Sequence, residues 1–174
     1  MARLDVQIIE LDPIRHGELT AAAEVWDRWR GDRLAPDWAD VVLTELPPPA
    51  LPFTVVVDLI DGGRDCRYRF WGSGMTRLYG SDETGKRLTE TSSEAIADAT
   101  QRQLAMLLER GGPMAFEVRM PRVSGDFVTK TNLRLPIAEG SGEIGKVITI
   151  AQVGPNVLRL GDDLATVWSR AAGG

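Results

Sequence analysis

The pattern that most constrains the fold is a long amphipathic helix followed directly by three strand patterns. The helix is predicted from Ser92 to Arg110, with Thr91 and Glu94 at capping-box spacing and Gly111-Gly112-Pro113 as a stop signal. The strand patterns that follow cover Met114–Met120, Phe127–Ile137 and Gly145–Val153. Short glycine-containing turns join them, so we expect an antiparallel meander.

Two more strands are predicted upstream of the long helix. The β-branched run Thr54–Ile60 is joined by Asp61-Gly62-Gly63, a typical hairpin turn, to a second strand at Cys66–Trp71. A short helix is expected from Met75 to Tyr79. This order predicts an α+β domain in which a five-stranded antiparallel sheet carries its helices on one face.

A separate amphipathic helix is predicted near the N-terminus, from Glu18 to Arg30. Its apolar stripe contains Trp26 and Trp29, which must be covered either by the domain's own sheet or by a partner in a dimer. Residues 32–53 hold five prolines and form a connector, with a short helix expected near Trp38 to Leu43.

Composition excludes several classes of protein. The 174 residues are 43% hydrophobic, enough for one domain with a full core. The net charge of -5, without a basic cluster, argues against a nucleic-acid partner. The single cysteine, Cys66, cannot form an internal disulfide, and no Cys or His pair has zinc-ligand spacing, so no metal is expected. Without a signal peptide or an apolar run long enough to span a membrane, we expect a cytoplasmic protein that does not contact membranes.

No constellation of residues indicates catalysis. The sequence has no recognisable Ser-His-Asp set, phosphate-binding glycine loop or pair of carboxylates on a buried face. We therefore expect a protein that is not an enzyme. The informative polar residues are instead Thr100 and Gln103, which fall on the apolar side of the long helix and need partners from protein, water or a ligand.

Two segments carry a resemblance to a known family. Residues 68–80, ending in Leu78-Tyr79-Gly80, and the loop Glu83–Leu88, with Thr84-Gly85-Lys86, resemble the core pattern of PAS domains. The upstream run Trp26–Pro36, with Asp40 beyond it, resembles a family of single-domain bacterial PAS proteins, mainly alphaproteobacterial, that carry a helical W-x-x-x-R extension. The resemblance divides the chain into residues 1–17, 18–53 (extension and connector), 54–154 (PAS-like core) and 155–174, with a last helix expected at Leu160–Arg170.

The resemblance implies a sensory or signalling module without an identified cofactor. Haem-binding PAS domains use a histidine on the helical side, whereas the only histidine here, His16, precedes the domain. Flavin-binding relatives that sense light use a cysteine in an Asn-Cys-Arg-Phe-Leu type motif, and Cys66 lacks that context. We therefore expect no cofactor.

Two functions remain open at this point. In the first, a cavity binds a small, mainly apolar ligand, and the protein signals as a homodimer or through an unidentified signalling partner. The expected cavity residues are Tyr68, Phe70, Met75, Leu78, Tyr79, Ile96, Thr100, Gln103, Phe116 and Met120. In the second, these side chains fill the core, and the protein is an interaction module with Trp26 and Trp29 as interface anchors.

Overall fold

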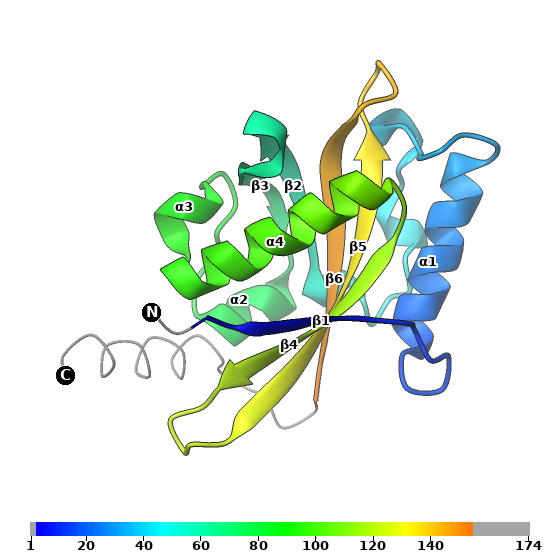
Figure 1. The fold of residues 1–174 in the computed structure, drawn as a ribbon. Helices are drawn as coiled ribbons and strands as arrows, with labels where there is room; N and C mark the ends of the chain where they lie inside the picture. Colours follow the sequence, from blue (N-terminus) through cyan, green and yellow to red (C-terminus); the bar gives the residue numbers. More distant parts are fainter. Residues whose placement is uncertain (1–2, 155–174) are drawn as a thin grey trace.

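The computed structural model describes residues 3–154 as one six-stranded antiparallel sheet with helices on both of its faces (Figure 1). Along the sheet the strand order is β1-β4-β5-β6-β2-β3. The strands are β1 (Asp5–Ile9), β2 (Thr54–Ile60), β3 (Asp65–Trp71), β4 (Met114–Pro121), β5 (Phe127–Ala138) and β6 (Ile144–Val153). The helices are α1 (Gly17–Arg30), α2 (Ser73–Tyr79), α3 (Leu88–Thr91) and α4 (Glu94–Arg110).

The α+β class and the antiparallel meander are confirmed, but the predicted number of strands is wrong. The sixth strand is β1, which pairs antiparallel with β4 from Asp5 opposite Arg119 to Ile9 opposite Ala115. Its five residues alternate only weakly between exposed and half-buried positions. A short edge strand of this kind is held by the ladder of its neighbour, so its own pattern predicts little.

The helices of the predicted core lie together on one face of the sheet, and the helix of the predicted N-terminal extension packs on the other. Helices α2, α3 and α4 cover one face, whereas α1 lies on the other side of β5 and β6 (Figure 1). Trp26 and Trp29 are 4% and 8% exposed, and the Trp26 indole donates a hydrogen bond to the carbonyl of Pro136 at 2.8 Å. Both indoles therefore pack against their own sheet, and neither is available as the interface anchor that the second function required.

The N-terminal end of α4 differs from the expected capping box. Ser93 is the N-cap residue, and its hydroxyl accepts a hydrogen bond from the Ile96 amide at 3.3 Å. The preceding residues form the separate single turn α3. The predicted stop is confirmed, because Gly111 adopts a left-handed conformation with φ of 74° and caps the helix.

The proline-rich connector contains three 3-10 turns, Trp38–Asp40, Leu43–Glu45 and Leu51–Phe53, in place of the expected short helix. Its last turn packs tightly on Gly72, where an added Cβ would stand 2.2 Å from the Pro52 carbonyl oxygen. Only glycine permits so close an approach between backbones. This contact fixes the point at which β3 ends and α2 begins.

The helix expected at Leu160–Arg170 lies outside the described residues. Across residues 3–154, no helix is long and apolar enough to cross a membrane.

Candidate ligand-binding site

A cavity of about 290 Å³ lies between the sheet and the layer formed by α2, α3 and α4. Five of the ten residues predicted for it line it: Tyr68, Met75, Tyr79, Ile96 and Thr100. Leu78, Gln103, Phe116 and Met120 are buried nearby but do not line it, and Phe70 is 37% exposed. Because this space remains, the side chains do not fill the core, as they would in the interaction module described above.

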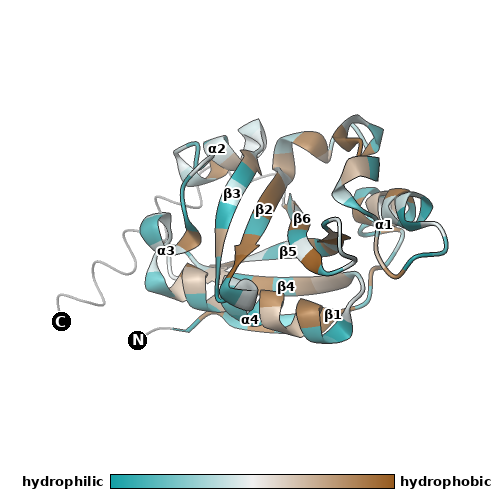
Figure 2. Ribbon diagram, turned by 90° about the horizontal axis from the view of Figure 1, so that it is seen from above, coloured by the Kyte–Doolittle hydropathy of each residue, from teal (hydrophilic) through white to brown (hydrophobic). Residues whose placement is uncertain are grey.

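The alternation of β5 divides its side chains between the two faces of the sheet. Lys130, Asn132 and Arg134 line the cavity, whereas Leu133 and Leu135 belong to the apolar cluster beneath α1. Strands β2 and β6 follow the same period of two, and the strands between the helical layers carry both hydrophobic and hydrophilic residues (Figure 2). One face of the central strands therefore brings polar groups into the protein interior.

Arg134 is held in place by two neutral partners. Its Nε donates to Oε1 of Gln103 at 2.9 Å, and its Nη1 donates to the Thr149 hydroxyl at 2.8 Å. The same Gln103 oxygen accepts from the Asn132 amide at 3.2 Å. Gln103 is only 1% exposed, so its role is to orient two cavity residues through protein contacts rather than to line the cavity.

Lys130 is the second buried cation of the cavity and is 9% exposed. Its Nζ donates to the hydroxyl of Tyr79 at 2.6 Å and lies 5.2 Å from the centre of that ring. Burial lowers the pKa of Lys130 to about 7, with a further contribution from the charge of Arg134. Burial lowers the pKa of Arg134 to about 10, so its guanidinium stays charged at neutral pH.

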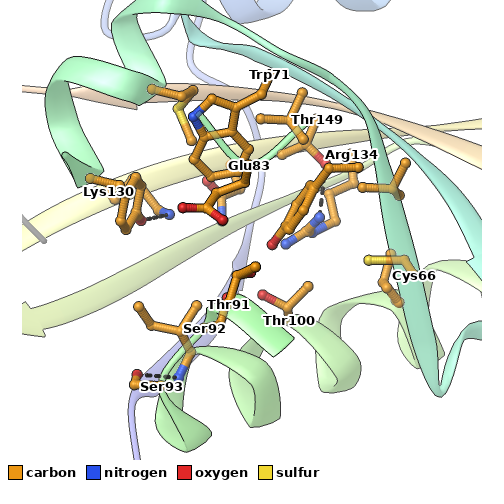
Figure 3. A pocket seen from close by; sticks show the side chains of 18 of the residues that line it. Cys66, Trp71, Glu83, Thr91, Ser92, Ser93, Thr100, Lys130, Arg134 and Thr149 are labelled. Atoms are coloured by element: carbon orange, nitrogen blue, oxygen red, sulfur yellow. Dashed lines mark hydrogen bonds between the residues drawn. The ribbon is translucent and has the colours of Figure 1, made fainter. Parts of the chain in front are cut away.

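Neither Lys130 nor Arg134 has an acidic partner in the part of the chain that the structure describes. Within residues 3–154, no carboxylate oxygen lies close enough to a side-chain nitrogen of Lys130 or Arg134, at 4.0 Å or less, to form an ion pair. Glu83 also lines the cavity (Figure 3), but it accepts from the Ser81 hydroxyl and pairs with Lys86 at 3.2 Å. The cavity therefore contains a guanidinium that is charged at neutral pH and an amine that is partly charged, and neither has a carboxylate partner in the described chain.

Two residues of the cavity lining each carry a buried polar atom that has no hydrogen-bond partner within residues 3–154. They are Oδ1 of Asn132, an acceptor on a residue that is 3% exposed, and Nε1 of Trp71, a donor. An unpaired buried polar atom costs about 1–3 kcal/mol, so such atoms are rare where nothing else binds. Both atoms belong to residues that line the cavity.

Apolar and aromatic side chains complete the lining. Trp71 makes edge contacts with Tyr68, at 4.9 Å between ring centres, and with Tyr79, at 5.8 Å. Burial raises the pKa of Cys66 to about 12 and raises the pKa of both tyrosines, so the thiol and the phenols stay protonated at neutral pH. Cys66 is fully buried and behaves as a small apolar residue.

Sequence reasoning missed the cationic groups, although a signal for them was present. A strand that alternates Lys130, Asn132 and Arg134 with Thr131, Leu133 and Leu135 normally exposes the more polar set to solvent. Here α4 must cover that face, because it packs on the same sheet. The lining of the cavity is amphipathic, with Lys130, Asn132 and Arg134 on the wall that β5 forms.

The described residues contain no group of three or more His, Cys, Asp or Glu that could hold a metal ion. His16 does not line the cavity; it is buried before α1, and its Nδ1 accepts a hydrogen bond from the Asp12 amide at 3.0 Å.

Comparisons with known proteins give similarity at the level of solved structures only. No protein-family model matches the chain, and no curated protein matches it. Similar structures include a PAS domain from Colwellia psychrerythraea, with a TM-score of 0.44, 17% identity, and coverage of 61% of this chain and 92% of that one. A light-oxygen-voltage domain studied with a flavin analogue has a TM-score of 0.41 and 14% identity, covering 69% and 86%. The blue-light photoreceptor domain of Aureochrome1 has a TM-score of 0.42 and 12% identity, covering 70% and 94%.

Proposed function

We propose that this chain is a PAS-type sensory module that binds a small organic anion in the cavity between β5 and α4. The carrying observation is that Lys130 and Arg134 line this cavity without a carboxylate partner among the described residues. The ligand-bound module signals through a second copy or a protein partner, in the cytoplasmic setting expected from the sequence. In this proposal the protein binds and does not catalyse.

The energetics of burial favour an anion. Removing a charge from water costs several kcal/mol unless an opposite charge or enough hydrogen bonds replace the lost hydration. Arg134 has two neutral acceptors and Lys130 has one. A carboxylate between them would supply the missing negative charge, and would also accept from the unpaired Trp71 indole if it reached that side.

The size and lining of the cavity define the ligand further. A volume of about 290 Å³ is at the lower end for small-molecule sites. Val55, Met75 and Ile96 provide apolar contacts on the same cavity. We therefore favour a short carboxylic acid with an apolar portion over an inorganic anion.

The residues that resemble the PAS pattern support the sensory assignment. They run through β3 and α2, and Tyr68, Trp71 and Tyr79 among them line the cavity. The resemblance thus involves the walls of the proposed site.

The test is a comparison of carboxylates with their neutral amides. Acetate, butyrate and benzoate are titrated by calorimetry and thermal unfolding, next to acetamide, butyramide and benzamide. We expect at least one acid to bind and to raise the melting temperature, since a ligand that binds only the folded state stabilises it. We expect the matching amide to bind at least tenfold more weakly.

Arg134→Gln should abolish this binding, because it removes the charge and keeps an amide near Thr149. The matched control is Arg77→Gln, which removes an exposed arginine of α2 away from the cavity lining. Circular dichroism checks that both variants fold. Equal affinity for acid and amide, or unchanged affinity in Arg134→Gln, would contradict the proposal.

A further inference from the structure

The two cations of the cavity differ in chemistry and stand apart on β5. Lys130 and Arg134 are separated by four residues on one face of the strand, about 13 Å between Cα atoms at about 3.3 Å per residue. Figure 3 shows Lys130 and Arg134 on either side of Glu83. Arg134 is an anion-binding group only, whereas an amine can also form a covalent bond.

The surroundings of Lys130 differ from those of the other two lysines. Lys86 pairs with Glu83 at 3.2 Å, and Lys146 pairs with Asp58 and Glu139 at 2.6 and 2.7 Å. Both of these side chains are therefore engaged in ion pairs. Lys130 has a phenol hydroxyl in place of a carboxylate and sits on the cavity wall.

We propose that Lys130 forms a reversible imine with the carbonyl carbon of a small oxo-carboxylic acid whose carboxylate is bound by Arg134. This inference rests on the proposed function, because it requires that the cavity binds organic anions. It adds the ligand's second functional group and a covalent mode of retention.

The step balances with groups that line the cavity. The lone pair of the neutral amine bonds to the carbonyl carbon, and the π electrons of the carbonyl move to its oxygen, which takes up a proton. The nitrogen loses one proton, and the resulting carbinolamine then loses its hydroxyl group with a second proton as water, leaving C=N. One amine and one carbonyl give one imine and one water, with no change of oxidation state.

Lys130 and Tyr79 suit these proton transfers. A pKa of about 7 leaves a substantial fraction of the Lys130 amine neutral at physiological pH. The Tyr79 hydroxyl is kept protonated by burial and lies 2.6 Å from Nζ. It is placed to exchange protons with the carbonyl oxygen and the nitrogen.

Three four-carbon probes separate the parts of the proposal. 4-Oxobutanoate carries both groups, butyrate lacks the aldehyde, and butanal lacks the carboxylate. Each is incubated with the protein at pH 7.5 and sodium cyanoborohydride, and the mass of the intact protein is measured. Peptide mapping then locates any reduced adduct among Lys86, Lys130, Lys146 and the N-terminal amine.

We expect 4-oxobutanoate to label Lys130 at least tenfold faster than it labels Lys86 or Lys146. We also expect it to label Lys130 at least tenfold faster than butanal does. Labelling should rise about tenfold between pH 6 and pH 8, following the neutral fraction of an amine with this pKa. Lys130→Arg should remove the adduct. Lys86→Arg, the matched control, should keep the adduct.

The outcomes distinguish this inference from the proposed function. Butyrate binding without an adduct at Lys130 overturns the imine and leaves the anion site standing. Equal labelling by butanal overturns the oxo-carboxylic class. If neither butyrate nor the acids tested above bind, the proposed function itself fails. Because peptide mapping is done on the unmodified sequence, the test does not depend on a variant folding.

Discussion

The two faces of the sheet are packed in opposite ways, although the same three central strands supply both. Beneath α1, the side chains form a closed apolar cluster in which the Trp26 indole is satisfied by the Pro136 carbonyl at 2.8 Å. Beneath α4, the cavity holds two buried cations, an unpaired amide oxygen on Asn132 and an unpaired indole nitrogen on Trp71. The first face stabilises the fold, and the second contains buried polar groups that cost stability, which we attribute to the ligand binding proposed above.

The largest effect should follow from truncating the closed face. Trp26→Ala removes a fully packed indole and its hydrogen bond, and we expect a loss of about 3–5 kcal/mol in the free energy of unfolding. Urea denaturation measures this loss. The control is Leu34→Ala, at a side chain that is 91% exposed, and its free energy of unfolding should stay within about 0.5 kcal/mol of the parent protein's. A loss below 1 kcal/mol for Trp26→Ala would show that α1 does not depend on this face.

The next largest effect should follow from replacing Gln103, which orients two residues of the cavity lining. Gln103→Leu takes the acceptor away from both Arg134 and Asn132, leaving buried donors unpaired. We expect a loss of about 2–3 kcal/mol, together with weaker anion binding. Gln103→Glu is the matched variant: it keeps the acceptor and neutralises Arg134, so it should retain stability and still lose affinity for carboxylates. Equal affinities in Gln103→Glu and the parent protein would argue against charge as the basis of binding.

A smaller effect concerns pH. The pKa of Lys130 in the folded protein, about 7, lies below the ordinary value of 10.5 for a lysine in the unfolded chain. Between these values the unfolded chain binds more protons, so the free energy of unfolding rises with pH in this window, and below pH 7 the penalty is complete. Lys130→Met removes the penalty and should be more stable than the parent by about 1–2 kcal/mol at pH 6.

The measurement is the difference in urea midpoint between parent and Lys130→Met from pH 6 to pH 9, in which other titrating groups cancel. The advantage of the variant should shrink as pH rises. A constant difference over this range would mean that Lys130 titrates normally, and that it is not buried as the structure has it.

The comparison also explains what could be predicted from the sequence. Strands with one buried face, such as Thr54–Ile60, and the helix stop at Gly111 follow from local patterns, and the structure agrees with them. The face on which α1 packs and the pairing of β1 depend on contacts between distant segments. The burial of Lys130 and Arg134 could not be predicted for the same reason. Alternation along β5 predicts that its side chains have two environments, but it does not show that α4 covers the polar side.

Strand β5 connects the two faces of the sheet directly, because it contributes residues to both. Arg134, which we expect to hold the ligand's carboxylate, precedes by two residues the Pro136 carbonyl that receives the Trp26 indole. A shift of the strand backbone at the first residue would reach the second without passing through a loop or a hinge. Binding of a ligand in the cavity would thus be transmitted along the backbone of β5 to the face that α1 covers. The fluorescence of Trp26 would report that displacement.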